Sequence, residues 1–209
     1  MTEPSPRIVA ALRGQLDEQR RLLQAGHERI GWKVALGIEE VERLVGAHPV
    51  IGYLTSATEL PSGARHSATG AEELCVDAEL AVRIGRDGAI SGFAAALELV
   101  DLRQGRGSVE SVLRANVLHR AFALGSAHDE PAQEARAFVN GNLESDRSID
   151  FDVEERVAAT AEWLSALGER LEPGDWIITG SIVQVPAAPG DDVAVELPEL
   201  DRLEVSIAD

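Results

Sequence analysis

Three acidic side chains, Asp77, Glu79 and Glu98, have the types and the spacing to hold a metal ion. Carboxylates that pack closely repel one another and raise each other's pKa unless a cation neutralises them. Ligation by carboxylate oxygens alone, with water completing the shell, suits a hard ion such as Mg²⁺ or Mn²⁺ better than zinc, whose usual donors are His and Cys. The sequence therefore predicts a divalent-metal site, provided that the fold brings the three acids together.

A β-hairpin would bring them together. The run 75–84 alternates apolar with other residues, which is the period of a strand, so Asp77 and Glu79 share one side. The Asp87-Gly88 pair favours a two-residue type I′ loop, and the apolar run after it can form the second strand. In that register position 77 lies opposite Glu98, with Cβ atoms about 5 Å apart on the same face.

A simpler interpretation is that these acids form the solvated face of a strand. The chain has 36 Asp and Glu residues against 19 Lys and Arg, so acids at alternating positions are expected. Against this, Glu98 lies inside the apolar run 94–100, and its neighbours on the same face, Ala81, Ala94 and Ala96, are small and apolar. An acid in such a run needs a partner. On the residues alone, both interpretations stay open.

Lys33 is a second candidate for chemistry. It lies in a predicted strand, 30–36, on a face otherwise made of Gly31, Ala35 and Gly37, which leaves room for a ligand beside it. Near a metal ion in a desolvated pocket its pKa would fall, and it could act as a general acid or base. The alternative is a solvated or snorkelling lysine at a sheet edge.

Composition limits the classes of protein. A chain of 209 residues fits one domain, 1–209, and the single cysteine, Cys75, excludes an internal disulfide framework. The net charge of −17 argues against nucleic acid or an anionic membrane as a partner. No apolar run is long enough to span a membrane, and the polar start 1–6 lacks the core of a signal peptide, so we expect a cytoplasmic protein.

Helices and strands alternate along the chain in a mixed, mostly β pattern. Ser5 can cap a helix over about 6–26 that packs on the rest of the domain, and Asp152 with Glu155 forms a capping box for a helix to Gly168. Further expected elements are a helix over 38–45, loops with short strands over 48–69, a helix capped by Ser108 through Leu124, a hairpin at Asn140-Gly141 and strands over 175–209.

Four motifs occur in an order that is similar to a known family. They are Gly31-Trp32-Lys33-Val34-Ala35-Leu36, Asp77-x-Glu79, Ala96-Leu97-Glu98-Leu99-Val100-Asp101, and Leu171-x-Pro173-Gly174-Asp175-Trp176-Ile177-Ile178-Thr179-Gly180-Ser181. Together they resemble the 2-keto-4-pentenoate hydratase / 4-oxalocrotonate decarboxylase branch of the fumarylacetoacetate hydrolase superfamily, from about residue 7 to residue 207. The resemblance implies an α+β fold, mostly β, with a mixed barrel or roll and flanking helices, and a homo-oligomer.

The resemblance also implies a site. Mg²⁺ or Mn²⁺ would be held by Asp77, Glu79 and Glu98, although the family strand more often has Glu at position 77. The ion would chelate a small 2-keto acid substrate and stabilise its enolate. Lys33 matches the lysine that handles protons. The Thr179-Gly180-Ser181 turn matches the segment that hydrogen-bonds the substrate near its carboxylate, with the Ser181 hydroxyl as the donor.

One departure from the family pattern concerns the activation of water. Where the branch has Gln-Pro-Asp, this chain has His48-Pro49-Val50, so an acid is absent, and His48 is the candidate to replace part of its function. The expected activity is that of a metal-dependent hydratase, a lyase, acting on a small 2-keto or 2-hydroxy-dienoic acid. The alternatives are a decarboxylase or tautomerase of a 2-keto acid, or a catalytically reduced member that serves as a partner subunit.

Overall fold

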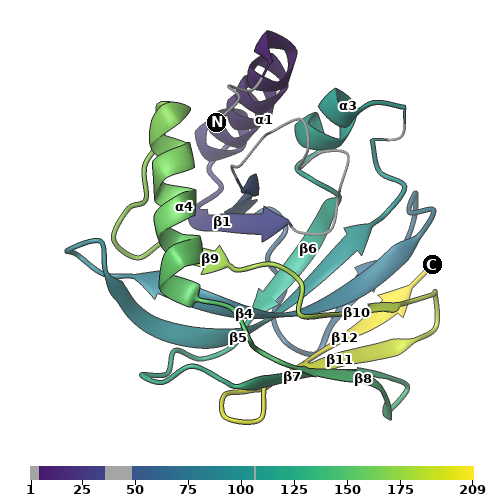
Figure 1. Ribbon diagram of the computed structural model, residues 1–209. Coiled ribbons are helices and arrows are strands. Elements are labelled where there is room, and N and C mark those ends of the chain that lie inside the picture. Colours follow the sequence, from purple (N-terminus) through teal and green to yellow (C-terminus); the bar gives the residue numbers. More distant parts are fainter. Residues whose placement is uncertain (1–4, 36–48, 106) are drawn as a thin grey trace.

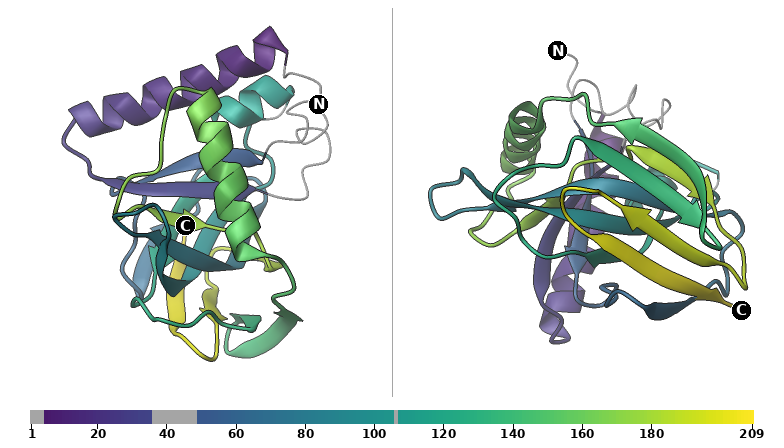
Figure 2. Two further views of the ribbon diagram at one scale, coloured as in Figure 1. Left: turned by 60° about the vertical axis from the view of Figure 1, so that its left-hand side comes forward. Right: turned by 90° about the horizontal axis from the view of Figure 1, so that it is seen from below.

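The structure is a computed structural model that describes residues 5–35, 49–105 and 107–209. These residues form two β-sheets and three helices. The predicted helix over 38–45 and the candidate residue His48 lie outside these ranges. Figure 1 shows the helices on one side of the larger sheet and most of the smaller sheet on the other. The views in Figure 2 show the same arrangement. No helix in the described ranges has the length and apolar character needed to cross a membrane.

The larger, seven-stranded sheet carries the predicted acidic hairpin at its centre. Its order is β2-β1-β9-β4-β5-β6, and β10 also pairs with β4. Its strands are β1 (Arg29–Ala35), β2 (Val50–Thr55), β4 (Leu74–Ile84), β5 (Ile90–Asp101), β6 (His119–Leu124), β9 (Trp176–Ile178) and β10 (Val183–Pro186).

The smaller sheet has five strands in the order β3-β12-β11-β7-β8. These are β3 (Ala64–Ser67), β7 (Glu134–Val139), β8 (Asn142–Ser148), β11 (Asp192–Glu196) and β12 (Arg202–Ala208). The predicted hairpin at Asn140-Gly141 is confirmed, because it joins β7 to β8 with positive φ angles of 51° and 79° at the two loop residues.

The helices begin at the predicted caps. Helix α1 (Pro6–Gln24) starts after Ser5, whose hydroxyl accepts the Ile8 N–H, and α4 (Val153–Ala166) starts after Asp152, whose carboxylate accepts the Glu155 N–H at 2.8 Å. The short α3 (Val109–Arg114) packs on α1, and both contribute to one apolar cluster with β2. These helices cover the larger sheet on the face opposite the smaller sheet (Figure 2).

Two local predictions were wrong. The helix capped by Ser108 ends at Arg114 and not at Leu124, because residues 116–118 adopt left-handed φ angles and the chain then pairs with β5 as strand β6. The β4–β5 loop is not a two-residue type I′ turn: a register shift after Arg83 lengthens it, and the Gly85 N–H donates to Ala89 O. The shift lies at the loop end, so the register at Asp77 is the predicted one.

The main core lies between the two sheets. Alternate residues of β4 and β5, with Val76, Leu80 and Leu97 among them, pack with the strands of the smaller sheet and are fully buried. The opposite face of the same two strands is also buried, beneath elements that include β1, β2 and β9. A sheet covered on both faces excludes water from the acids of the hairpin.

Candidate active site and metal centre

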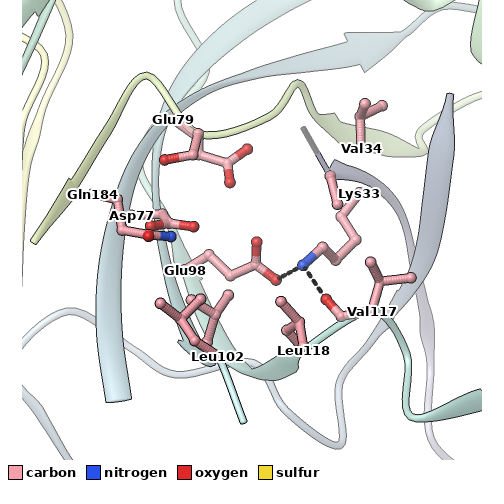
Figure 3. A pocket seen from close by; sticks show the side chains of 12 residues that line it. Lys33, Val34, Asp77, Glu79, Glu98, Leu102, Val117, Leu118 and Gln184 are labelled. Atoms are coloured by element: carbon pink, nitrogen blue, oxygen red, sulfur yellow. Dashed lines mark hydrogen bonds and ion pairs between the residues drawn. The ribbon is translucent and has the colours of Figure 1, made fainter. Parts of the chain in front are cut away.

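The β4–β5 hairpin brings the three predicted acids together. Asp77 lies directly opposite Glu98, and Glu79 projects from the same face two residues further along β4. All three are almost fully buried, with 4%, 1% and 1% of their surface exposed. One carboxylate oxygen from each lies within 4.8 Å of the others, and Figure 3 shows the three side chains converging. The interpretation as a solvated strand face is therefore wrong.

Lys33 completes this cluster from strand β1. Its side chain is 2% exposed, and its Nζ lies 2.5 Å from Glu98 Oε1 and donates to the Val117 carbonyl at 3.1 Å. The short strand β9 lies between β1 and β4, and its pairing with β1 ends at Lys33 and Ile178. Beyond that point β9 no longer separates β1 from β4, and the Lys33 side chain can reach the acids. The alternative of a solvated edge lysine is excluded by this burial.

Gly52 makes room for the lysine. It pairs with Lys33 across the β1–β2 ladder, and a Cβ atom at position 52 would lie 2.9 Å from Lys33 Cγ and 2.7 Å from Asn116 Oδ1. Both distances are shorter than ordinary van der Waals contact, so a larger residue would displace the lysine.

The three acids have strongly different pKa values. Burial, followed by the charge of Glu98, raises the pKa of Asp77 to about 7, and the same causes raise the pKa of Glu79 well above its usual range. Burial alone would raise the pKa of Glu98 as well, but the Lys33 ammonium and the His119 hydrogen bond outweigh it and lower this pKa to about 2. The contacts with Lys33 and His119 thus keep Glu98 ionised, whereas at Asp77 and Glu79 the charge of Lys33 lowers the pKa too little to offset burial.

A divalent cation fits this set of groups. Three carboxylates and one ammonium sum to a charge of −2, which such an ion would balance. Asp77 Oδ1 is buried and has no hydrogen-bond partner among the described residues, although an unpaired buried oxygen is costly. The donors are carboxylate oxygens only, which suits Mg²⁺ or Mn²⁺.

The segment after β9 supports the acids. The Gly180 N–H donates to Glu79 Oε2 at 2.7 Å, and the buried Thr179 hydroxyl donates to Leu80 O at 2.8 Å. Of the three residues predicted to bind substrate, only Ser181 lines the cavity. The backbone N–H of Gly180 and the hydroxyl of Thr179 are bonded within the protein. The Ser181 hydroxyl hydrogen-bonds to Asp77, but Ser181 lines the cavity, so it is the residue of this turn that would contact a ligand.

A cavity of about 210 Å³ opens onto the cluster. Its polar lining consists of Lys33, the three acids, Ser181 and Gln184. The rest of the lining, called the apolar wall below, consists of Val34, Ala35, Val100, Leu102, Val117 and Leu118. A lining of this mixed kind suits a small ligand with polar and apolar parts.

The sequence did not indicate several groups of this site. Gln184 pairs with Asp77 in the β10–β4 ladder, and its side chain and that of Ser181 hydrogen-bond to Asp77 and lower its pKa. His119 reaches Glu98 Oε1 with its Nδ1 at 2.6 Å. His119 begins strand β6, but the sequence analysis assigned these residues to a helix, so the position of His119 opposite Glu98 was missed.

Comparison with known proteins extends this description. The sequence matches no protein-family model, and it matches no curated protein. Solved structures do match: 4-oxalocrotonate decarboxylase from Pseudomonas putida G7, complexed with magnesium and adipate, superposes with a TM-score of 0.84 at 21% identity, covering 96% of this chain and 86% of that chain. The same enzyme complexed with calcium and acetate gives 0.83 at 22% identity, covering 96% and 85%.

A more distant neighbour widens the range of reactions found on this fold. Fumarylpyruvate hydrolase from Pseudomonas aeruginosa, in complex with Mn²⁺ and pyruvate, has a TM-score of 0.62 at 15% identity and covers 87% of this chain and 89% of that chain. These neighbours are members of the fumarylacetoacetate hydrolase superfamily, and the predicted mostly β architecture with flanking helices is confirmed. The chain therefore has the fold of the fumarylacetoacetate hydrolase superfamily, as its sequence motifs implied.

Proposed function

We propose that this protein is a divalent-metal-dependent enzyme of the fumarylacetoacetate hydrolase superfamily that decarboxylates a small 2-oxo acid. The observation that carries the proposal is the buried set of three carboxylates beside the Lys33 ammonium, at the end of a cavity of about 210 Å³. A protein without a ligand for this site would bury two acids with raised pKa values for no gain.

The solved neighbours support both the cation and the substrate class. The decarboxylase from Pseudomonas putida G7 was crystallised with magnesium, and the fumarylpyruvate hydrolase was crystallised with Mn²⁺ and the 2-oxo acid pyruvate. The motifs of the chain point to the same branch of the superfamily. We extend these properties to this chain because its three acids, its lysine and its cavity have the arrangement that such chemistry requires.

Each group would have a distinct role. Asp77, Glu79 and Glu98 would hold the cation, which, when bound, would stabilise negative charge on the oxygens of a 2-oxo acid. Lys33 Nζ is oriented by Glu98 and by the Val117 carbonyl. When a distal carboxylate, conjugated with the 2-oxo group, leaves as CO₂, the electron pair would pass to the 2-oxo oxygen, and Lys33 would deliver its proton to the carbon that has lost CO₂. The Ser181 hydroxyl would orient the substrate carboxylate, and the apolar wall would exclude water.

Decarboxylation fits the described lining better than hydration, the reaction expected first from the sequence. Hydration needs a group that activates water. At the position of the family acid, Val50 is 1% exposed and packs in the apolar cluster with α1. Within the described part of the chain, the acids that line the cavity are the three of the metal set. Decarboxylation requires only an electron sink and a proton donor, whereas tautomerisation also requires a base that removes a proton from the substrate.

The test combines metal binding with turnover. Calorimetry should detect one Mn²⁺ or Mg²⁺ per chain, and ultraviolet absorbance should show metal-dependent consumption of 4-oxalocrotonate or a related unsaturated 2-oxo dicarboxylic acid, with release of CO₂. Lys33→Met should keep the ion, because it removes a neighbouring positive charge, and should lose turnover. Metal binding without turnover of any 2-oxo acid would favour the partner-subunit alternative, and absence of metal binding would overturn the proposal.

A further inference from the structure

The turn between α3 and β6 has an unusual backbone. Asn116, Val117 and Leu118 have φ angles of 56°, 53° and 68°, so three successive residues other than glycine are left-handed. This conformation is strained, most of all for the β-branched Val117. Such strain persists only where the surroundings impose it, and it concentrates at functional sites.

The side chain of Asn116 fixes this turn to the larger sheet. Its Oδ1 accepts the Tyr53 N–H at 2.8 Å, and its Nδ2 donates to the Tyr53 carbonyl at 2.9 Å. The amide thus satisfies both backbone groups of one residue of β2, as a neighbouring strand would. Because β2 pairs with β1, the turn is held in register with Lys33.

This turn places two groups in contact with the Lys33–Glu98 ion pair. The Val117 carbonyl accepts from Lys33 Nζ at 3.1 Å, and two residues later His119 Nδ1 lies 2.6 Å from Glu98 Oε1. Oε1 of Glu98 therefore contacts both Lys33 and His119. Figure 3 shows the other oxygen of Glu98 pointing away from Lys33, towards Glu79.

The side chain of His119 is fixed by contacts on the side away from Glu98. It is 6% exposed, its Nε2 lies 2.9 Å from the Thr58 hydroxyl, and its ring packs on Phe122 with centroids 5.9 Å apart. A carboxylate can only accept, so Nδ1 carries the proton that is donated to Glu98, and the Thr58 hydroxyl, which can donate or accept, is a partner for Nε2. His119 does not line the cavity, and its contact with a ligand would run through Glu98.

We propose that His119 is a positioning residue: with Thr58 behind it, it holds Oε1 of Glu98 against Lys33 and so presents Oε2 to a divalent cation. This rests on the proposed function, since it assigns a second layer to the same metal site. Outer partners of ligating side chains are worth about 10- to 100-fold in metal affinity or activity.

The test measures Mn²⁺ affinity by calorimetry and apo stability by thermal unfolding. His119→Leu should weaken Mn²⁺ binding about 10- to 100-fold. His119→Asn should lose clearly less than His119→Leu, because its Nδ2 can occupy the place of the histidine Nδ1, and its remaining loss should be no more than about 2- to 10-fold, because it lacks the atom that contacts Thr58. His128→Leu is the matched control, since His128 Nε2 lies 3.5 Å from Asp201 Oδ2, outside the site, and it should bind Mn²⁺ as wild type does.

The outcomes separate this inference from the proposed function. A wild-type protein that binds no Mn²⁺ would overturn the proposed function. Wild-type affinity in a folded His119→Leu, or equal losses in the Leu and Asn variants, would overturn the role of His119. If His119→Leu does not fold, Thr58→Val should weaken binding about 2- to 10-fold while Thr58→Ser does not, and equal affinities in that pair would overturn it.

Discussion

Over residues 76–81 the two faces of strand β4 share one backbone and are both buried, yet they contribute to stability with opposite sign. On one face Val76, Ala78 and Leu80 pack against the smaller sheet, where burial of apolar surface stabilises by about 25 cal/mol per Å². On the other face Asp77 and Glu79 are removed from water with pKa values raised by burial. The first face holds the fold together, and the second is costly without a cation.

This difference explains how the protein maintains a destabilising cluster. Because side chains alternate along a strand, the apolar and the acidic residues of β4 point to opposite sides. The acids therefore take no position in the apolar core between the sheets. The core can therefore offset the cost of burying carboxylates. Substitutions on the apolar face should therefore change the free energy of unfolding alone, and substitutions on the acidic face should change metal binding. The largest effects are expected for a residue that contributes to both.

Glu98→Gln should have the largest effect. It removes the charge that pairs with Lys33 at 2.5 Å, which leaves a buried ammonium without its counter-ion. We expect the free energy of unfolding to fall by about 3–5 kcal/mol, and Mn²⁺ binding to be lost. Urea unfolding and calorimetry measure the two effects.

The double variant Lys33→Met/Glu98→Gln is the control. It should regain part of the stability but should not bind the metal ion. Unchanged ion binding in Glu98→Gln would remove this residue from the site.

Leu97→Ala tests the opposite face one residue away. Leu97 is fully buried against the smaller sheet, and its truncation leaves a cavity there. The free energy of unfolding should fall by about 3 kcal/mol, while Mn²⁺ affinity stays within a factor of two, because the acids keep their positions. A large change in affinity would show that the two faces are coupled, contrary to the comparison.

Asp77 makes the acidic face sensitive to pH. Its pKa rises from 3.8 in the unfolded chain to about 7, so the folded protein binds this proton more tightly, and the resulting stabilisation is lost as the pH rises towards 7. Between pH 5 and pH 7.5, in the presence of a chelator, this group should lower the free energy of unfolding by about 2–3 kcal/mol.

Asp77→Asn is the control for that pH dependence. It should remove the part of the slope that Asp77 contributes, while Glu79, whose pKa is also raised by burial, keeps its own part, and the variant should be more stable than the wild type at pH 7.5 without metal. Glu98, with a pKa of about 2, titrates below this window and does not mask the effect. Saturating Mg²⁺ at pH 7.5 should restore stability to the wild type only. Parallel slopes for the two proteins in urea unfolding would contradict the raised pKa of Asp77.

The sequence predicted the elements whose pattern is local. The period of β4, the apolar run of β5 and the caps Ser5 and Asp152 each depend on residues close together in the chain, and the register of Asp77 with Glu98 follows from the hairpin. The loop was wrong in detail but right in register. The convergence of the three acids could therefore be predicted from the hairpin, whereas their interpretation as a metal site depended on the family resemblance.

What could not be predicted depends on contacts between distant segments. Lys33 meets Glu98 because β9, from residues 176–178, joins β1 to β4, and nothing in the local pattern reports that order. The turn at Asn116 contains no glycine to mark its left-handed backbone, so its apolar residues were assigned to a helix. Its stability comes from Tyr53, 63 residues away, and with that turn the position of His119 was missed.

Arg83→Ala should have the smallest effect and marks where the acidic face ends. Arg83 follows Asp77, Glu79 and Ala81 on the same side of β4, but it is exposed and lies over the Trp176 ring at 5.9 Å. Its removal should lower the free energy of unfolding by about 0.5–1 kcal/mol and leave Mn²⁺ affinity unchanged. Thermal unfolding and calorimetry measure both. A larger loss of stability or of Mn²⁺ affinity would mean that the charge of Arg83 is also buried. The metal-binding part of this face would then extend further towards the β4–β5 loop.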